Sequence, residues 1–198
     1  MADGARVAGE TEEEVYAALG MQWMPPEMRE NRGEIELARK GQVPKVVDLP
    51  DIRGDLHIHS EASDGVDGVG ALAAAAEVHG YDYFAITDHS QSLTVGNGLS
   101  VERMLENIGH IRTVQEEHPG VHLLAGAEVE IDAKGGLDYP QGLLEELDVV
   151  VAAVHSHFKM TPEEMTERLL SALSKESVDV LAHPTGRLIG EREGYGFD

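Results

Sequence analysis

Residues 123–129 read Leu-Leu-Ala-Gly-Ala-Glu-Val, an apolar run that carries one acidic residue. Such a run is typical of a strand buried on both faces of a parallel sheet. Glu128 is the exception in it, because burying an unpaired carboxylate costs several kcal/mol. We therefore expect Glu128 to be paired or bound to metal, and a carboxylate at this position can bridge two metal ions.

Four more runs of this kind predict strands, and helical segments alternate with them. The expected strands are residues 53–59, 83–87, 122–131, 149–155 and 179–182. Helices are expected at residues 69–79, 100–117 and 142–147, and from Thr161, where Thr, Pro and Glu form a capping box. This alternation indicates an α/β fold with a parallel sheet.

The first 50 residues follow a different pattern. Residues 11–20 predict a short helix that stops at Gly20, and residues 27–40 can hold one more helix that ends at Gly41. Too little apolar surface is present here for an independent domain, so we expect a connector or a remnant of something larger.

The composition excludes several kinds of site. The chain has 198 residues, 41% of them hydrophobic, and no cysteine. Disulfides, thiolate zinc sites and cysteine nucleophiles are therefore excluded, which leaves histidine and carboxylate as the strong metal ligands. Because the sequence has neither a long apolar run nor a signal-peptide pattern, we expect a soluble cytoplasmic protein without a membrane partner.

The net charge of −22 argues against a nucleic acid partner at low salt, because phosphate contacts depend on Lys and Arg. Lysine is scarcer than arginine, 5 against 10, and this pattern favours a protein of concentrated salt, as in halophilic archaea. At 1 M salt the Debye length is only about 3 Å, so an acidic surface would not repel DNA from a distance. An ordinary acidic cytoplasmic protein is the alternative.

Metal-capable side chains lie near the carboxyl end of every expected strand, where α/β folds build their active sites. They are His57 and His59, Asp88 and His89, Glu128, His155, and His183. Residues two apart on a strand point to the same side, so His57 and His59 can hold one metal together. Asp64, in the turn after them, can add an oxygen ligand. The sequence therefore predicts a metal site at this edge of the sheet.

Each of these residues also has an ordinary interpretation. Asp64 can be a turn aspartate bonded to its own backbone, and residues 88–89 can be a solvated pair at a strand exit. His155 and His183 can be neutral core histidines. The recurrence at five strand ends favours metal binding.

Together these segments resemble the PHP (polymerase and histidinol phosphatase) family. The motifs are Asp-Leu-His-Ile-His-Ser at 55–60, Thr-Asp-His at 87–89, Glu128, Val-His-Ser at 154–156 and Ala-His-Pro at 182–184. Residues 25–30, 51–57 and 183–188 are similar to the bacterial and archaeal family X DNA polymerases in particular. The resemblance implies a distorted (β/α)7 TIM-like barrel, here incomplete, in residues 51–198, after a helical thumb remnant in residues 1–50.

The resemblance also implies a cluster of up to three divalent ions, Mn, Zn or Fe. The first would take His57, His59 and Glu128, the second Glu128, His155 and His183, and the third Asp64 and His89. The candidate catalytic residues are Glu128, Asp88 and Arg187. Arg187 would clamp phosphate, although a surface salt bridge is an alternative for it.

The implied activity is hydrolysis of DNA phosphoesters by metal-activated hydroxide, as a 3′-5′ exonuclease or in 3′-end processing during repair. Polymerase activity is excluded, because 50 residues cannot hold a palm domain, and a separate chain would have to supply that module. The family's closing Asp-x-His motif does not occur before Asp198. Only the second metal site then has all its protein ligands, and we expect slow turnover.

Three other interpretations stay open. A histidinol-phosphatase-like enzyme for small molecules shares all the metal motifs. An amidohydrolase-type barrel also opens with His-x-His, but its carboxylated lysine has no counterpart, since neither Lys134 nor Lys159 lies at a strand end. The third interpretation is a metal-binding fragment with weak or no catalysis.

Overall fold

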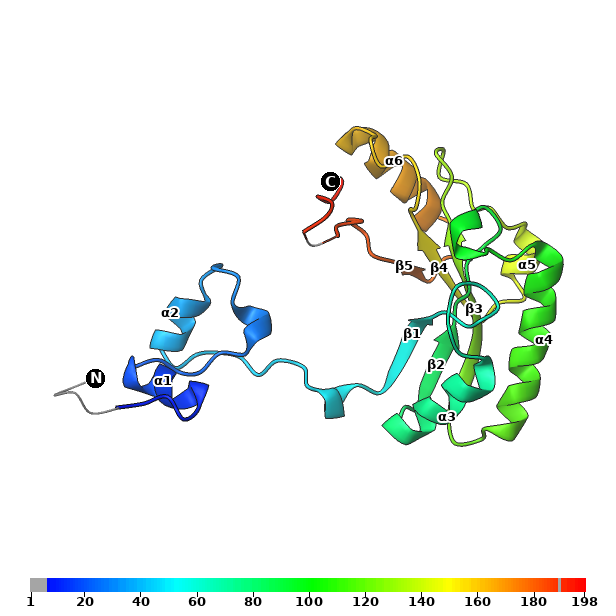
Figure 1. Ribbon diagram of the computed structural model, residues 1–198. Coiled ribbons are helices and arrows are strands. Elements are labelled where there is room, and N and C mark those ends of the chain that lie inside the picture. Colours follow the sequence, from blue (N-terminus) through cyan, green and yellow to red (C-terminus); the bar gives the residue numbers. More distant parts are fainter. Residues whose placement is uncertain (1–6, 189) are drawn as a thin grey trace. The chain divides into compact units, whose positions relative to one another are not determined.

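The computed structural model describes residues 7–188 and 190–198, and the chain forms two compact units, Met1–Asp51 and Ile52–Asp198. The larger unit holds one sheet of five parallel strands in the order β1-β2-β3-β4-β5 (Figure 1). The strands are β1 (Gly54–Ile58), β2 (Tyr83–Ile86), β3 (His122–Glu130), β4 (Val149–Ala153) and β5 (Val180–Leu181). They curl into a half-barrel, so the α/β fold with an incomplete barrel is confirmed.

The curl follows from the stagger between neighbouring strands. The first half of β3, from His122 to Ala125, pairs with β2, and its second half, from Gly126 to Glu130, pairs with β4. Such a stagger is what closes a sheet toward a barrel. The switch occurs at Gly126, where a Cβ would lie 2.8 Å from the backbone oxygen of Val149, so only glycine permits this close approach.

Helices cover the outer face of this sheet. The helices α3 (Val69–His79) and α4 (Val101–Glu117) pack on β2 and β3, and α6 (Pro162–Leu173) packs on β4 (Figure 1). The short α5 (Gln141–Leu144) lies between β3 and β4 in the chain. The expected caps are present: the Ser100 side chain accepts from a backbone N–H of α4, and Thr161 and Glu164 form the capping box of α6.

The smaller unit holds the helix expected within residues 27–40. It is α2 (Glu34–Arg39), which ends before Gly41, and a 3-10 turn at Pro26–Met28 precedes it. The Glu34 carboxylate accepts from the backbone N–H groups of Asn31 and Arg32, and this local capping ends the turn before the helix begins. The other helix, α1 (Glu12–Ala18), begins after Thr11, whose hydroxyl caps it.

Two short helical turns were not expected from the sequence. They are the 3-10 turns Leu49–Asp51 and Thr94–Gly96, of which the second lies in the loop that follows β2. Within the described residues, every helix is too short or too polar to cross a membrane.

Candidate metal centre

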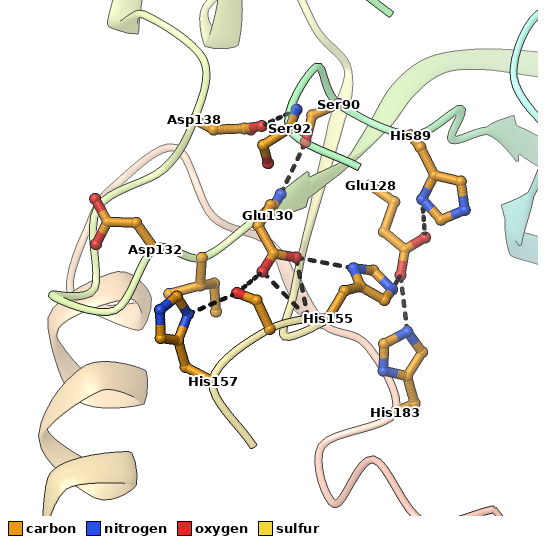
Figure 2. A network of polar contacts seen from close by, with 12 residues as sticks. His89, Ser90, Ser92, Glu128, Glu130, Asp132, Asp138, His155, His157 and His183 are labelled. Atoms are coloured by element: carbon orange, nitrogen blue, oxygen red, sulfur yellow. Dashed lines mark hydrogen bonds and ion pairs between the residues drawn. The ribbon is translucent and has the colours of Figure 1, made fainter. Parts of the chain in front are cut away.

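The Glu128 side chain lies at the centre of a cluster of imidazoles. Only 2% of the residue is exposed, because β3 is flanked by β2 and β4 and covered by the core. Its Oε2 atom lies 3.3 Å from His57 Nε2, 3.4 Å from His59 Nε2 and 2.9 Å from His89 Nδ1. Its Oε1 atom lies 3.3 Å from His155 Nε2 and 2.8 Å from His183 Nε2 (Figure 2). The two oxygens therefore face two different sets of nitrogens.

The five histidines reach the cluster from the ends of four strands, β1, β2, β4 and β5, or from the loops after them, and both His57 and His59 belong to the β1 end. His57 lies in β1, and a register shift between Asp55 and Ile58 bends the strand there. His89 follows β2 and forms a bridge to Glu128, while His155 and His183 follow β4 and β5. Parallel strands bring all their carboxyl ends to one edge, so residues up to 126 positions apart, from His57 to His183, become neighbours.

Asp64 extends the cluster on one side. Its Oδ1 lies 3.6 Å from His59 Nδ1, and its Oδ2 lies 3.3 Å from His89 Nε2. Three groups have ligand atoms within 4.8 Å of one another: His57 with His59 and Glu128, His59 with Asp64 and His89, and His89 with Glu128 and His155. Among the described residues, His59, His89 and Glu128 each occur in two of these groups, and of the three only the Glu128 carboxylate can bridge two ions.

The cluster also leaves buried nitrogen atoms without a hydrogen bond. The Nδ1 atoms of His59 and His89 are buried and have no hydrogen-bond partner, although carboxylate oxygens lie near both. Buried polar groups in proteins are normally satisfied, so such atoms call for a ligand. Imidazole nitrogen and carboxylate oxygen are a donor set that suits Mn, Zn or Fe. The residues therefore fit a divalent metal cluster.

The electrostatics of the cluster favour an ionised Glu128. Burial would raise the pKa of Glu128, but its contacts with His155, His183, His57 and His89 outweigh burial and hold the pKa far below its ordinary value. For His155, burial lowers the pKa, while Glu128 and Glu130 together raise it to about 9. Burial, and then the neighbouring His89, lower the pKa of His59. Glu128 and Glu130 thus favour a protonated, positively charged His155, as they would favour a bound cation.

Glu130 is a functional residue that the sequence interpretation missed. It is 6% exposed, and its carboxylate accepts from the Nδ1 of His155 at 2.9 Å, the backbone N–H of His155 at 3.0 Å and the Ser156 hydroxyl at 2.6 Å (Figure 2). With Nδ1 donating to Glu130, His155 turns its Nε2 toward the cluster, where a bound cation would displace the proton of that nitrogen. The Glu-x-Glu spacing on a strand could have revealed it, since both carboxylates point to one side.

Asp88 lies apart from the ligand nitrogens. It is fully buried, and its two carboxylate oxygens accept from the Ser60 N–H and hydroxyl, the Ser63 hydroxyl and the Asn107 amide at 2.6–2.9 Å. These donors occupy both oxygens. They tie the turn after β1, which carries Asp64, to the end of β2 and to α4. The direct catalytic role expected for Asp88 therefore lacks a geometric basis in these contacts.

Arg187 lies in an exposed loop after β5. Together with His155, His183 and Asp64 it lines an open cleft beside the cluster. The structure thus brings Arg187 to the same edge of the sheet as the imidazoles.

Comparisons with known proteins agree with this architecture. The sequence profile of the PHP domain matches residues 55–193, and that of the DNA polymerase beta thumb matches residues 1–30. The DNA polymerase/3′-5′ exonuclease PolX of Bacillus subtilis is 42% identical over 188 residues, which cover 95% of this chain and 33% of that protein.

Shorter relatives match as well. A probable phosphatase of Acetivibrio thermocellus is 37% identical and one of Thermoanaerobacter is 30% identical, each over 66% of this chain and 53% of the relative. The chain thus spans about a third of the polymerase and about half of each phosphatase. Since the PHP profile matches most of its length, this chain belongs to the PHP domain family and carries a segment of a polymerase beta-type thumb at its N-terminus.

Proposed function

We propose that residues 51–198 form a metal-dependent phosphoesterase domain that hydrolyses DNA phosphoesters, as a 3′-5′ exonuclease or in 3′-end processing during repair. The observation that carries the proposal is the buried Glu128, whose two oxygens face two separate sets of imidazoles. This arrangement suits a carboxylate that bridges two ions. The similarity to the PolX polymerase/exonuclease supports DNA as the substrate class.

In this proposal His57 and His59 share one ion with Glu128, and His155 and His183 share a second with Glu128. Asp64 and His89 hold a third, with His59 close to both. Divalent ions there would neutralise charge on the phosphate and lower the pKa of an attacking water. Glu130 orients His155, and Asp88 acts as a positioning residue for the Asp64 turn. Arg187 binds a phosphate oxygen from the cleft.

The polymerase module that would work with this domain lies outside the matched PHP and thumb segments, so we propose that another part of the protein or a separate chain supplies it. We place the activity in the cytoplasm, where DNA repair substrates of a bacterial cell are found.

Metal content and DNA hydrolysis of the wild type and of Glu128→Gln test the proposal. Elemental analysis of the wild type is expected to find bound Mn, Zn or Fe, and Glu128→Gln is expected to lose bound metal, because the amide cannot bridge cations as a carboxylate does. With Mn²⁺ the wild type should shorten a 5′-labelled oligonucleotide from its 3′ end, and the variant should not. Glu116→Gln, which changes the same charge on an exposed position of α4, should behave like the wild type.

A folded wild type that takes up no metal would contradict the proposed metal centre. A metal-loaded chain that hydrolyses no phosphoester would contradict the proposed activity. The measured rate also tests the expectation of slow turnover.

A small-molecule phosphatase is the second candidate, because two probable phosphatases are 37% and 30% identical to this chain over 66% of its length. Histidinol phosphate and an oligonucleotide with a 3′ phosphate separate the two functions. Preference for the oligonucleotide, measured as kcat/KM at one fixed salt concentration, supports the DNA substrate. Preference for histidinol phosphate supports the phosphatase.

A further inference from the structure

An open cleft of about 480 Å³ is lined by three residues of the candidate metal centre, His155, His183 and Asp64. Leu93 and Val95, from the loop after β2, form an apolar wall, and Phe158 and Arg192 lie among its other lining residues. Sites for small organic ligands typically measure about 300–1,000 Å³ and combine apolar walls with a few polar groups, as this cleft does.

A cation-over-aromatic pair gives the cleft a planar surface. The guanidinium carbon of Arg192 lies 4.3 Å from the centre of the Phe158 ring. The Arg192 Nε atom donates to the backbone oxygen of Gly186 at 2.9 Å, which fixes the guanidinium plane. Tyr195 stacks on Phe158 with 22° between the ring planes and 6.0 Å between the centroids. We call Phe158, Arg192 and Tyr195 the stacking platform.

The backbone is shaped to hold this platform. Gly186 has φ +59°, and a Cβ there would lie 2.6 Å from the Tyr195 ring, so a side chain at this position would displace it. The Tyr195 N–H donates to the oxygen of Thr185, and Leu188 and Arg192 form an antiparallel bridge. The loop after β5 therefore returns on itself, so that Arg192 lines the same cleft as His183, which precedes that loop.

The charge of the platform stands out in this chain. The net charge is −22 and only 15 residues are basic, yet two arginines, Arg187 and Arg192, line the cleft next to the metal cluster. Such a surface complements an anionic ligand that carries a flat ring. Nucleobases stack on guanidinium and aromatic planes, and the phosphate of the same nucleotide would reach the metal cluster.

We propose that the cleft binds the terminal nucleoside of the DNA 3′ end, with its base on the stacking platform and its phosphate at the metal cluster. The proposal rests on the proposed function for the identity of the ligand as DNA. It adds a base-binding site, and it makes Arg192 and Phe158 determinants of substrate specificity. Because stacking is tolerant of sequence, any of the four bases is accepted.

Binding of thymidine 5′-monophosphate and of 2-deoxyribose 5-phosphate tests the proposal. Isothermal titration calorimetry on the metal-loaded chain, at one salt concentration, gives both affinities, and recovered ligand is checked for intact phosphate. The wild type is expected to bind the nucleotide about 5- to 150-fold more tightly than the sugar phosphate, the range that one stacked base contributes. Arg192→Ala should bring this ratio close to one.

Matched variants separate stacking from charge and from folding. Arg192→Lys keeps the charge without the plane, so the ratio should fall there too. Arg187→Ala should weaken both ligands equally and leave the ratio unchanged. Arg53→Ala removes the same charge at the amino-terminal end of β1, next to Asp82, and should change neither affinity. Arg192 is exposed, so its variants are expected to fold and to keep their metal content.

Equal affinity of the wild type for the two ligands would overturn the proposal, and so would a ratio that survives in Arg192→Ala and Arg192→Lys. The affinity ratio and DNA cleavage are measured separately, so the two proposals can fail separately. If the chain prefers the nucleotide but cleaves no DNA, the base-binding site stands and the proposed DNA hydrolysis is wrong. If it cleaves DNA but shows no preference for the nucleotide, the proposed DNA hydrolysis stands and the base-binding site is wrong.

Discussion

Single side chains decide how the candidate metal ligands are oriented, and Glu130 is the clearest case. Its carboxylate accepts from His155 Nδ1, so the opposite ring nitrogen lies 3.3 Å from Glu128 Oε1, where ligands converge. Carboxylate partners of this kind fix the tautomer and the angle of a ligating imidazole. Arg168 is 2% exposed, and its Nη2 atom lies 3.7 Å from the Glu130 carboxylate. Its Nη1 atom donates to the Ser156 backbone oxygen, so Arg168 restrains the backbone next to His155.

We predict that Glu130→Ala weakens metal binding about 10- to 100-fold, because His155 loses the acceptor that orients it. Competition with a chromophoric chelator measures the affinity. Glu130→Gln keeps an amide oxygen for Nδ1–H and should restore part of the loss. Ser156→Ala removes another donor to the same carboxylate but leaves His155 its acceptor, so it serves as the control. A Glu130→Ala protein with wild-type metal affinity would show that His155 needs no such partner.

At the scale of elements, α4 is joined to the sheet by a partly exposed carboxylate outside the candidate metal centre. Asp148, which precedes β4, accepts from both terminal nitrogens of Arg112 on α4 at 2.6 and 2.8 Å and from the backbone N–H of Ala125 in β3 at 2.8 Å. Burial raises the pKa of Asp148, but Arg112 and the Ala125 N–H outweigh it, and the pKa lies below its ordinary value. The ion pair thus joins one helix and two strands.

We predict that Asp148→Asn lowers the free energy of unfolding by about 1 kcal/mol at pH 7, because solvent screens a pair whose side chains are 47% and 29% exposed. Because the folded pKa is depressed, the ionised carboxylate stabilises the fold above the unfolded pKa of about 3.9, and this stabilisation is lost as the pH falls through the folded pKa. The difference between wild type and variant should therefore be constant near neutrality and narrow below about pH 4.

Urea denaturation at several pH values measures this difference. Asp82→Asn is the control, because the Asp82–Arg53 pair is more than half exposed and should contribute less. A difference that stays the same down to pH 3 would mean that packing around residue 148, and not its charge, carries the effect.

At the scale of the whole molecule, the net charge of −22 sets the response to salt. Such a charge destabilises a compact state by self-repulsion, and salt screens that repulsion as the Debye length falls from about 10 Å at 0.1 M to about 3 Å at 1 M. The relatives named above are bacterial, so they give no support to a halophilic archaeal source.

We predict that the unfolding temperature of the metal-free chain rises between 0.1 and 1 M KCl, because screening reduces the repulsion among its acidic side chains. Circular dichroism at 222 nm follows the transition. Sucrose at equal osmolality is the control, since it favours compact states without screening charge. If sucrose raises the temperature as much as KCl does, general solute exclusion explains the effect and the charge does not.

Much of this architecture follows from local patterns in the chain. The apolar runs predict all five strands within one or two residues of their ends, since a strand buried on both faces needs a continuous apolar stretch. The caps of α4 and α6 follow from Ser100 and Thr161 because capping is a local hydrogen bond. The helix expected within residues 27–40 forms, and the hydrogen bonds of the Glu34 carboxylate to the N–H groups of Asn31 and Arg32 set where it begins.

The sequence by itself thus determined the α/β class, the strand order along the chain and the residue types at the strand ends. Only the tertiary structure decided which oxygen of Glu128 faces which histidine, that Asp88 turns to Ser60 and Asn107, and that Glu130 supports His155. It also decided that Arg192 meets Phe158. These contacts join residues that are at least 19 positions apart, and 55 positions apart for Glu128 and His183. They depend on the stagger of the strands and the path of the loops, which no local pattern encodes.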